Sequence, residues 1–257
     1  MNQISLVRKA SRIAVCLGVL LGFALVPSAV WAQCTTFAYA PPDGRIIEEF
    51  IGAGGDEGFF FIGPPGRSYS VEVMTEDDTS PTIFFGNAGV SCPTSTGGIY
   101  RVTSAIVPLV ITSRGSRASF TAVTGGTPFY AVRVQSGTTA TYRYSVSDTT
   151  QYHPGWSTGG GFNTFYSILN TTNDSCTVTL TLFNLAGAQV ATATQAIAAG
   201  ALLATNTSAL GVAAGLAGTG RLTHNCPPGA IFVDAAIANF GGMPPSIIPA
   251  KFAPVRE

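Results

Sequence analysis

The chain has 257 residues with 13 basic and 13 acidic side chains, and only 10% of its residues are charged. This balance excludes the broad positive surface with which proteins bind nucleic acids. The length allows one large β domain or two domains of about 110 residues each.

Residues 1–32 have the three parts of a secretory signal peptide. A basic region precedes an apolar run over 13–26 and a compact cleavage site, with the defining residues Arg8, Lys9, Arg12, Val30, Trp31 and Ala32. We expect cleavage after Ala32 and export to the periplasm or the medium. Loss of the three basic residues leaves ten against 13 acidic ones, a formal charge of −3 for the exported chain.

Five cysteines occur in the sequence, and one of them, Cys16, lies inside the signal segment. The even number that remains in an exported chain predicts two disulfides, for which three pairings are open. Because two cysteines fall in each half of the chain, we predict one bridge within each half, Cys34–Cys92 and Cys176–Cys226.

The first half, residues 33–150, alternates with a period of two over 69–73, 130–134 and 142–146. Aromatic and β-branched residues in this pattern are typical of half-buried strands. The four residues 136–139 (Ser-Gly-Thr-Thr) predict a hairpin turn between the last two strands. Short strands separated by Gly/Pro clusters, without a long helical pattern, predict an all-β fold of the sandwich or jelly-roll type.

A resemblance to a known family rests on these strands. The segments 56–61 (DEGFFF) and 66–73 (GRSYSVEV) look like the first hairpin of the bacterial pre-peptidase C-terminal domain. The segments 130–134 and 142–146 are similar to its closing hairpin, so that the match covers roughly residues 34–150. The resemblance implies a jelly-roll-like β-sandwich that serves as an accessory to a secreted enzyme.

Charges become scarce after residue 150, and a segment rich in glycine follows. We therefore predict a linker over 151–161 and a second β-sandwich domain over 162–257. Alternation over 177–182 predicts a strand there, and Ser208, Leu210, Leu216 and Gly218 favour a short helix over 208–218. The segments 166–171 and 178–187 resemble β-sandwich modules of exported bacterial proteins.

The stretch 175–220 carries no charged residue, which raises the question of a membrane span. The polar residues 205–208 lie at its middle, and Ala and Gly supply much of its apolar character. A spanning helix needs about 20 strongly apolar residues. We predict no membrane span after signal cleavage.

The motif 155–159 (Gly-Trp-Ser-Thr-Gly) matches the nucleophile elbow of serine hydrolases, and Asp174 and His224 follow in the order of a triad. The Pro and Gly neighbours of Ser157 favour a flexible segment instead. His153 and His224 are an alternative zinc pair, but their spacing is not that of metal ligands. We predict no catalytic residue, no metal site and no cofactor.

Acidic clusters leave calcium open as a ligand. Glu76, Asp77 and Asp78, together with Asp56 and Glu57, carry the oxygen ligands that calcium prefers. Their spacing is not that of an EF-hand loop, and solvated loop carboxylates explain them equally well.

Tyr152 and Trp156 are the predicted binding residues. Trp156 is the only tryptophan after Trp31 is removed, and with Tyr152 it can form a stacking platform for a sugar. We favour the alternative that Trp156 seals the contact between the two domains.

These features predict an exported, two-domain, non-catalytic protein of the all-β class. It would bind an envelope component, a polysaccharide or a protein partner as an accessory module. A secreted hydrolase that uses Ser157 or a histidine-bound metal is the alternative, and a structural component of the cell envelope is the third.

Overall fold

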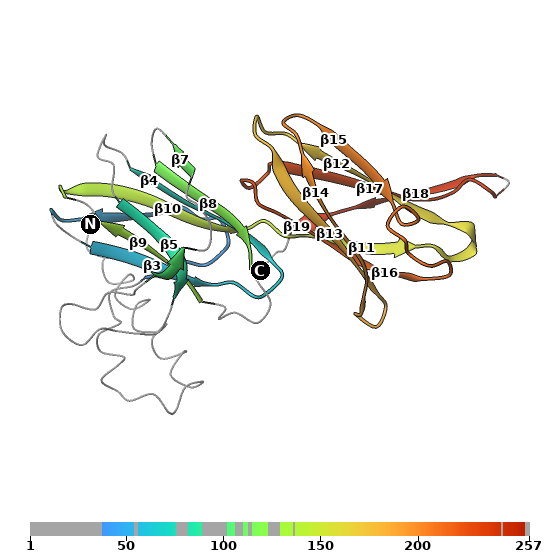
Figure 1. Ribbon diagram of the computed structural model, residues 1–257, viewed down its shortest axis with the longest axis horizontal. Coiled ribbons are helices and arrows are strands. Elements are labelled where there is room, and N and C mark those ends of the chain that lie inside the picture. The colour runs from blue at the N-terminus through green and yellow to red at the C-terminus, as the bar shows by residue number, and fades with distance from the viewer. Residues whose placement is uncertain are drawn as a thin grey trace, which may run out of the picture.

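The protein consists of two β-sandwiches joined end to end (Figure 1). The structure is a computed structural model that describes residues 38–53, 56–75, 82–88, 102–105, 110–112, 115–122, 129–135, 137–242 and 244–254. The predicted signal segment, Cys34, Cys92 and residues 76–78 lie outside the described residues, so the predictions for them stay predictions. Within the described part, no helix is long and apolar enough to cross a membrane.

The first sandwich packs two five-stranded sheets face to face. One sheet has the strand order β1 (Ala38–Tyr39), β3 (Asp56–Ile62), β9 (Phe129–Gln135), β5 (Thr82–Ala88), β6 (Val102–Ala105). The other has the order β2 (Ile47–Ile51), β10 (Ala140–Asp148), β4 (Ser68–Thr75), β8 (Gly115–Thr121), β7 (Val110–Thr112). All neighbouring strands are antiparallel except the short pair of β1 and β3.

Aromatic rings fill the space between these two sheets. The rings of Phe59 on β3 and Tyr144 on β10 stack with their centroids 3.9 Å apart. Phe61 stacks on Tyr130 at 5.3 Å, and Phe120 approaches Tyr130 at 4.8 Å. The predicted period of two therefore holds, because these residues all turn inward on their strands.

The predicted hairpin at 136–139 is wrong, since β9 and β10 belong to different sheets. β9 pairs with β3 and β5, and β10 pairs with β2 and β4. The segment between them carries the chain from one layer to the other. The segments 56–61 and 66–73 likewise lie on β3 and β4 in opposite sheets.

The second sandwich has a five-stranded and a four-stranded sheet. The five-stranded sheet has the order β14 (Gln189–Ile197), β13 (Cys176–Asn184), β16 (Ala217–His224), β11 (Gln151–Ser157), β19 (Ala253–Pro254). The four-stranded sheet has the order β15 (Leu202–Asn206), β12 (Asn163–Asn170), β17 (Ile231–Asn239), β18 (Ser246–Lys251). The strands of these sheets confirm the all-β class that the alternation predicts.

The linker predicted over 151–161 is wrong in its structure. Residues 151–157 form β11, which pairs with β16 inside the second sandwich. A bulge between His153 and Trp156 accommodates Pro154, which cannot donate a ladder hydrogen bond. Thr158 and the following 3-10 turn Gly159–Gly161 are the part of 151–161 that lies outside β11.

The helix predicted over 208–218 is also absent from the structure. The residues from Thr207 to Gly215 form consecutive turns, with hydrogen bonds from Gly211 N to Ser208 O and from Val212 N to Thr207 O. Gly211 and Gly215 adopt φ angles of 72° and 82°. A right-handed helix cannot continue through such residues, and β16 begins at Ala217.

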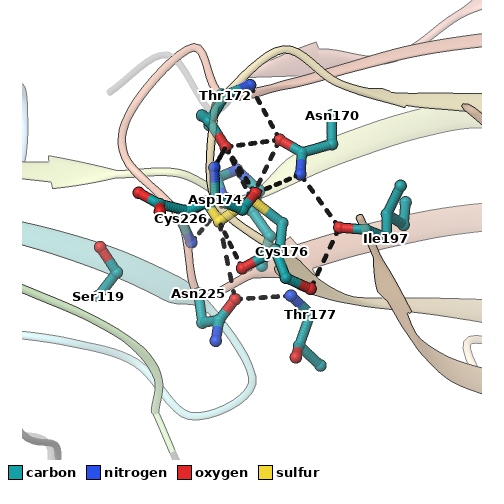
Figure 2. Close-up of a disulfide and its surroundings, with 12 residues drawn as sticks. Ser119, Asn170, Thr172, Asp174, Cys176, Thr177, Ile197, Asn225 and Cys226 are labelled. Atoms are coloured by element: carbon teal, nitrogen blue, oxygen red, sulfur yellow. Dashed lines mark hydrogen bonds between the residues drawn. A yellow bond between two sulfur atoms is a disulfide. The ribbon is translucent and has the colours of Figure 1, made fainter. Parts of the chain in front are cut away.

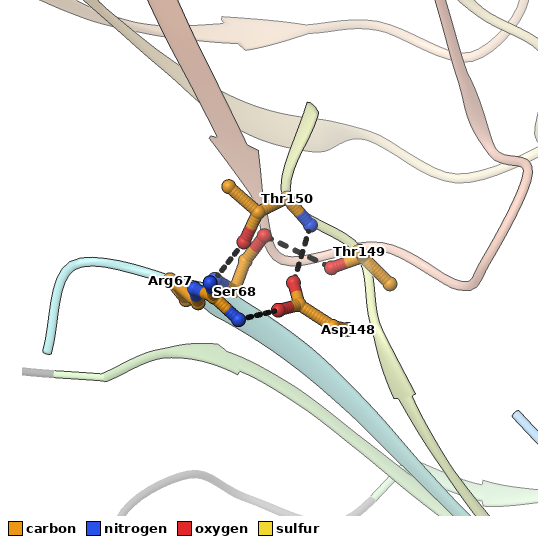
Figure 3. A network of polar contacts seen from close by, with 5 residues as sticks. All are labelled: Arg67, Ser68, Asp148, Thr149 and Thr150. Atoms are coloured by element: carbon orange, nitrogen blue, oxygen red, sulfur yellow. Dashed lines mark hydrogen bonds and ion pairs between the residues drawn. The ribbon is translucent and has the colours of Figure 1, made fainter. Parts of the chain in front are cut away.

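Residues 148–150 connect the two sandwiches and are bound tightly to the first one (Figure 3). Arg67 pairs with Asp148 at 3.1 Å, and Ser68 N donates to Thr150 Oγ1 at 2.9 Å. Thr149 Oγ1 donates to Ser68 Oγ at 2.9 Å. The connector is thus a fixed joint that leads directly from β10 into β11.

Candidate functional site

The structure separates the two predicted binding residues. Trp156 is 1% exposed and lies in the core of the second sandwich, where its Nε1 donates to the carbonyl oxygens of Phe183 and Thr219. Tyr152, on the same strand, is 37% exposed. The indole is therefore part of one sandwich's core, and it forms neither a sugar platform with Tyr152 nor the seal between domains.

The structure also keeps Ser157 and His224, the nucleophile and base candidates of the triad, apart. Ser157 lies opposite Ala217 at one end of β16, and His224 lies at the other end. Seven residue steps along β16 separate the two positions, which is roughly 23 Å. The Ser157 hydroxyl accepts a hydrogen bond from Gly159 N at 3.1 Å, a local contact within its own turn.

Both histidines are buried in separate places. His153 lies opposite Gly220, four residues from His224 along β16, which corresponds to roughly 13 Å. Burial lowers the pKa of each imidazole to about 4. Neither ring nitrogen of His153 has a hydrogen-bond partner among the described residues. In that part of the chain no three His, Cys, Asp or Glu side chains gather as a metal-ligand set.

The predicted disulfide Cys176–Cys226 is confirmed, with the two Cα atoms 5.7 Å apart. Figure 2 shows Asn170 beside it, at the end of β12. The fully buried Asn170 amide donates to the carbonyl oxygens of Asp174 and Ile197 at 2.7 and 3.0 Å, and its oxygen accepts from Thr172. The disulfide and this network fix the end of the sandwich that faces the first one.

A groove of about 520 Å³ opens beside the connector, and we call it the joint groove. Its walls come from the connector, β11, the end of β16, the β16–β17 loop, β17 and the segment that joins β18 to β19. The lining residues are Asp148, Thr149, Gln151, His224, Pro228, Gly229, Ile231, Phe232, Val233, Asp234, Lys251, Phe252 and Pro254.

Some polar groups of the joint groove are already bonded within the protein, and others are exposed to a ligand. The Asp148 carboxylate is committed to Arg67 and to Thr150 N. Gln151 spans the groove, because its Nε2 donates to the carbonyl oxygen of Ile231 at 2.9 Å. Asp234 and Lys251 lie opposite each other on β17 and β18 with exposed side chains, so the groove presents both signs of charge.

An aromatic side chain stands at the outer edge of the groove. Phe232 is 62% exposed, and it lies next to Leu169 on the outer face of the four-stranded sheet. On the far side of Leu169 comes Leu202, which is 61% exposed. Leu202, Leu169 and Phe232 thus form an apolar row across three strands that ends at the groove.

Sequence reasoning missed these residues although part of the signal was present. The alternation over 231–239 places Ile231 and Val233 on the buried face, so Phe232 between them must point outward. A contiguous exposed apolar patch, such as the row of Leu202, Leu169 and Phe232, is what marks an interaction surface. The contribution of Gln151, Lys251 and Phe252 depends on long-range strand order, for which the sequence carried no signal.

No family model matches the chain, and no curated protein matches it. Among solved structures, the pre-peptidase C-terminal domain of a collagenase from Bacillus anthracis is 14% identical, with a TM-score of 0.31. The match covers 43% of this chain and 96% of that domain. It is the family that residues 34–150 resemble in sequence.

Two further solved structures are more distant. The full extracellular region of zebrafish Gpr126/Adgrg6 is 7% identical over 86% of this chain and 31% of that chain, with a TM-score of 0.26. A calcium-binding mutant of β-glucuronidase 2 from Bacteroides uniformis is 11% identical over 77% and 26% of the two chains, with a TM-score of 0.17. Likenesses at this level do not assign a function.

Proposed function

We propose that this chain is an exported, non-catalytic binding protein that engages a macromolecular partner through the joint groove. The partner is an envelope component, a polymer or a protein. The observation that carries the proposal is the groove itself, which combines an exposed aromatic ring, both signs of charge and walls from the connector and the second sandwich. Such a mixture of apolar and polar groups is typical of ligand sites.

The fixed joint supports this function. The ion pair of Arg67 and Asp148 and the hydrogen bonds of Thr149 and Thr150 hold one wall of the groove in place. A binding site that is already ordered loses less conformational entropy when its ligand arrives. The joint therefore favours tight binding from a groove of modest size.

Two features of the chain, a disulfide in its second half and the composition of residues 1–32, support export. The Cys176–Cys226 disulfide is of the kind that persists in oxidising compartments. The basic and apolar segments over 1–32 have the composition of a signal peptide.

The non-catalytic part of the proposal draws on strand register. Ser157 and His224 lie at opposite ends of β16, too far apart for proton transfer between them. Treatment of the purified chain with a fluorophosphonate probe tests the rival hydrolase. Covalent labelling of Ser157 would contradict a non-catalytic function.

Site-specific photocrosslinking tests the binding function. Benzoylphenylalanine at position 232 places the reactive group at the groove, and the same residue at position 240 is the control, because Phe232 and Phe240 are 62% and 64% exposed. We expect a defined crosslinked product from position 232 that unlabelled protein competes away. Equal products from both positions, or none from either, would contradict the proposed function.

The same experiment addresses a structural role. The apolar row of Leu202, Leu169 and Phe232 gives a surface on which copies of the chain can associate. A product from position 232 that contains only a second copy of this chain would favour an assembling envelope component over a binding protein.

A further inference from the structure

We propose that the joint groove takes an extended peptide segment, which adds as a strand to β17 at Ile231–Val233. This inference rests on the proposed function, because it names the class of ligand for the same groove. Its basis is a stretch of strand edge with no neighbouring strand among the described residues, which the order of the strands exposes inside the groove.

The two neighbours of β17 cover different lengths of it. β12 pairs with β17 from Ile231 to Ala238. β18 pairs with it only from Asn239 back to Asp234. Among the described residues no strand pairs with the other side of Ile231, Phe232 and Val233, so this stretch is an edge within an otherwise covered strand.

The hydrogen-bond alternation shows which peptide groups point to that edge. Thr171 N donates to Ala230 O at 2.9 Å, so this position is a hydrogen-bonded pair of the β12–β17 ladder. In antiparallel ladders such pairs alternate with pairs whose N–H and C=O groups point away. Ile231 and Val233 therefore direct their peptide groups toward the groove, and Phe232 and Asp234 direct theirs toward β12.

A side chain already uses this edge. The Gln151 amide reaches across from the five-stranded sheet and donates to the carbonyl oxygen of Ile231 at 2.9 Å. This contact is what one rung of an added strand would make. It shows independently that the Ile231 peptide group faces the groove.

β18 does not pair with β17 beyond Asp234 because of the path that the chain takes after β18. Beyond Lys251 the chain leaves the four-stranded sheet and pairs as β19 with β11, with Pro254 opposite Gln151. The Phe252 ring turns inward and stacks on His153 with a centroid distance of 4.9 Å. The position that β18 would have occupied beside Ile231–Val233 is thereby left to the groove.

The size and the side chains of the groove fit a short peptide. Its 520 Å³ lies within the ~300–1,000 Å³ of ligand pockets. Main-chain hydrogen bonds give affinity in strand addition, and alternate side chains give specificity. An outward-facing side chain of the added strand would extend the row of Leu202, Leu169 and Phe232, so the peptide carries an apolar residue opposite Phe232.

The first test needs no ligand. Amide hydrogen exchange of the exported chain, read residue by residue by NMR, should show fast exchange at Val233 and slow exchange at Phe232 and Asp234. Slow exchange at Val233 in the protein alone would overturn the proposal, because the edge would then already be occupied.

The second test uses an acetylated and amidated hexapeptide of alternating threonine and valine at millimolar concentration. We expect it to slow the exchange of Val233 and to leave strands outside the groove unchanged. The control is the same peptide N-methylated at every residue, which keeps its side chains but cannot donate from its backbone. Protection by both peptides, or by neither, would overturn strand addition.

Matched variants locate the contact. Phe232→Ala removes the aromatic end of the row and should weaken peptide binding by up to about fivefold, the upper end of the effect of losing one cross-strand pair. Phe240→Ala removes an equally exposed ring outside the groove and should leave binding unchanged. Equal effects of the two variants would count against the groove.

The two proposals fail differently. If position 232 crosslinks a partner while the peptide does not protect Val233, the groove binds by another chemistry, and only the strand-addition proposal is wrong. If no product depends on position 232, the proposed function itself is wrong.

Discussion

Arg67 and Asp148 form an ion pair of 3.1 Å that binds the connector between the sandwiches to the residue directly before β4 (Ser68–Thr75). The Asp148 side chain is only 4% exposed, and its second oxygen accepts from Thr150 N at 2.9 Å. One carboxylate thus joins the first sandwich, the connector and the start of the second.

The Arg67→Ala variant should lower the free energy of unfolding by about 1–3 kcal/mol, because a buried carboxylate loses its charged partner. Arg143→Ala is the control, since its pair with Glu48 has side chains that are 45% and 54% exposed and such pairs contribute ~0–1 kcal/mol. Urea unfolding measures both. Equal losses would mean that Arg67 acts only as a surface charge.

Trp156 should report on the core of the second sandwich rather than on the contact between domains. Its indole is 1% exposed and donates to Thr219 O at 2.9 Å. In the chain that begins at Gln33 we expect blue-shifted emission that iodide does not quench. Proteolytic separation of the sandwiches near residue 150 should leave the emission unchanged, and a red shift on cleavage would contradict this placement.

The strands of this fold could be predicted because alternation depends only on which face of a strand is buried. Tyr142 and Tyr144 turn inward as their spacing requires. The partner of each strand could not be predicted in this way. A short polar turn such as 136–139 connects neighbours in one sheet or opposite layers of a sandwich, and a period of two is the same in both.

The linker predicted over 151–161 was wrong because it was inferred from composition, whereas backbone geometry decides whether such a segment forms a strand. Pro154, Gly155 and three further glycines resemble a linker, yet the bulge in β11 absorbs the proline while Trp156 anchors the strand. The disulfide Cys176–Cys226 could be predicted, because two cysteines fall in each half of the chain. The joint groove could not be predicted, since its strand edge exists only where β18 stops pairing with β17.

The disulfide Cys176–Cys226 closes a loop with a sequence separation of 50 residues. In the chain-entropy model a loop of this length stabilises the folded state by about 4 kcal/mol. The Cys176→Ala/Cys226→Ala double variant should therefore unfold at clearly lower urea concentration. Peptide mapping without reduction checks the bridge, and it also tests the predicted pair Cys34–Cys92; a bridge between the two halves would contradict both.

Stability should fall with acid between about pH 6.5 and pH 4. In the unfolded chain both histidines take up protons near the ordinary imidazole pKa of 6.5, whereas burial holds the pKa of His153 and His224 at about 4 in the folded protein. The unfolded state therefore binds more protons in this window, and each histidine costs up to about 3 kcal/mol by pH 4. Above pH 6.5 this contribution is constant.

The His153→Phe variant separates the two histidines. It keeps a ring to stack on Phe252 and removes two buried nitrogens that have no partner among the described residues. We expect a shallower loss of stability between pH 6.5 and 4 in urea titrations at each pH. An unchanged slope would show that His153 does not contribute.

Gly66 should matter for the contact between the sandwiches. Its φ is 77°, and a methyl group there would lie 2.9 Å from the Arg221 guanidinium, which packs over the Phe183 ring at 5.2 Å. Gly187 has nearly the same φ of 79°, with nothing within 4 Å of the added carbon. The two glycines therefore share the backbone cost and differ only in what the methyl group meets.

Both Gly66→Ala and Gly187→Ala should lose about 1–2 kcal/mol of unfolding free energy, because alanine is strained at positive φ. Only Gly66→Ala should also displace Arg221 and loosen the two sandwiches. Residual dipolar couplings measured for each sandwich detect that change as a wider spread of relative orientations. If the couplings of Gly66→Ala match those of Gly187→Ala, Arg221 does not hold the sandwiches together, and the connector at Asp148 alone fixes their orientation.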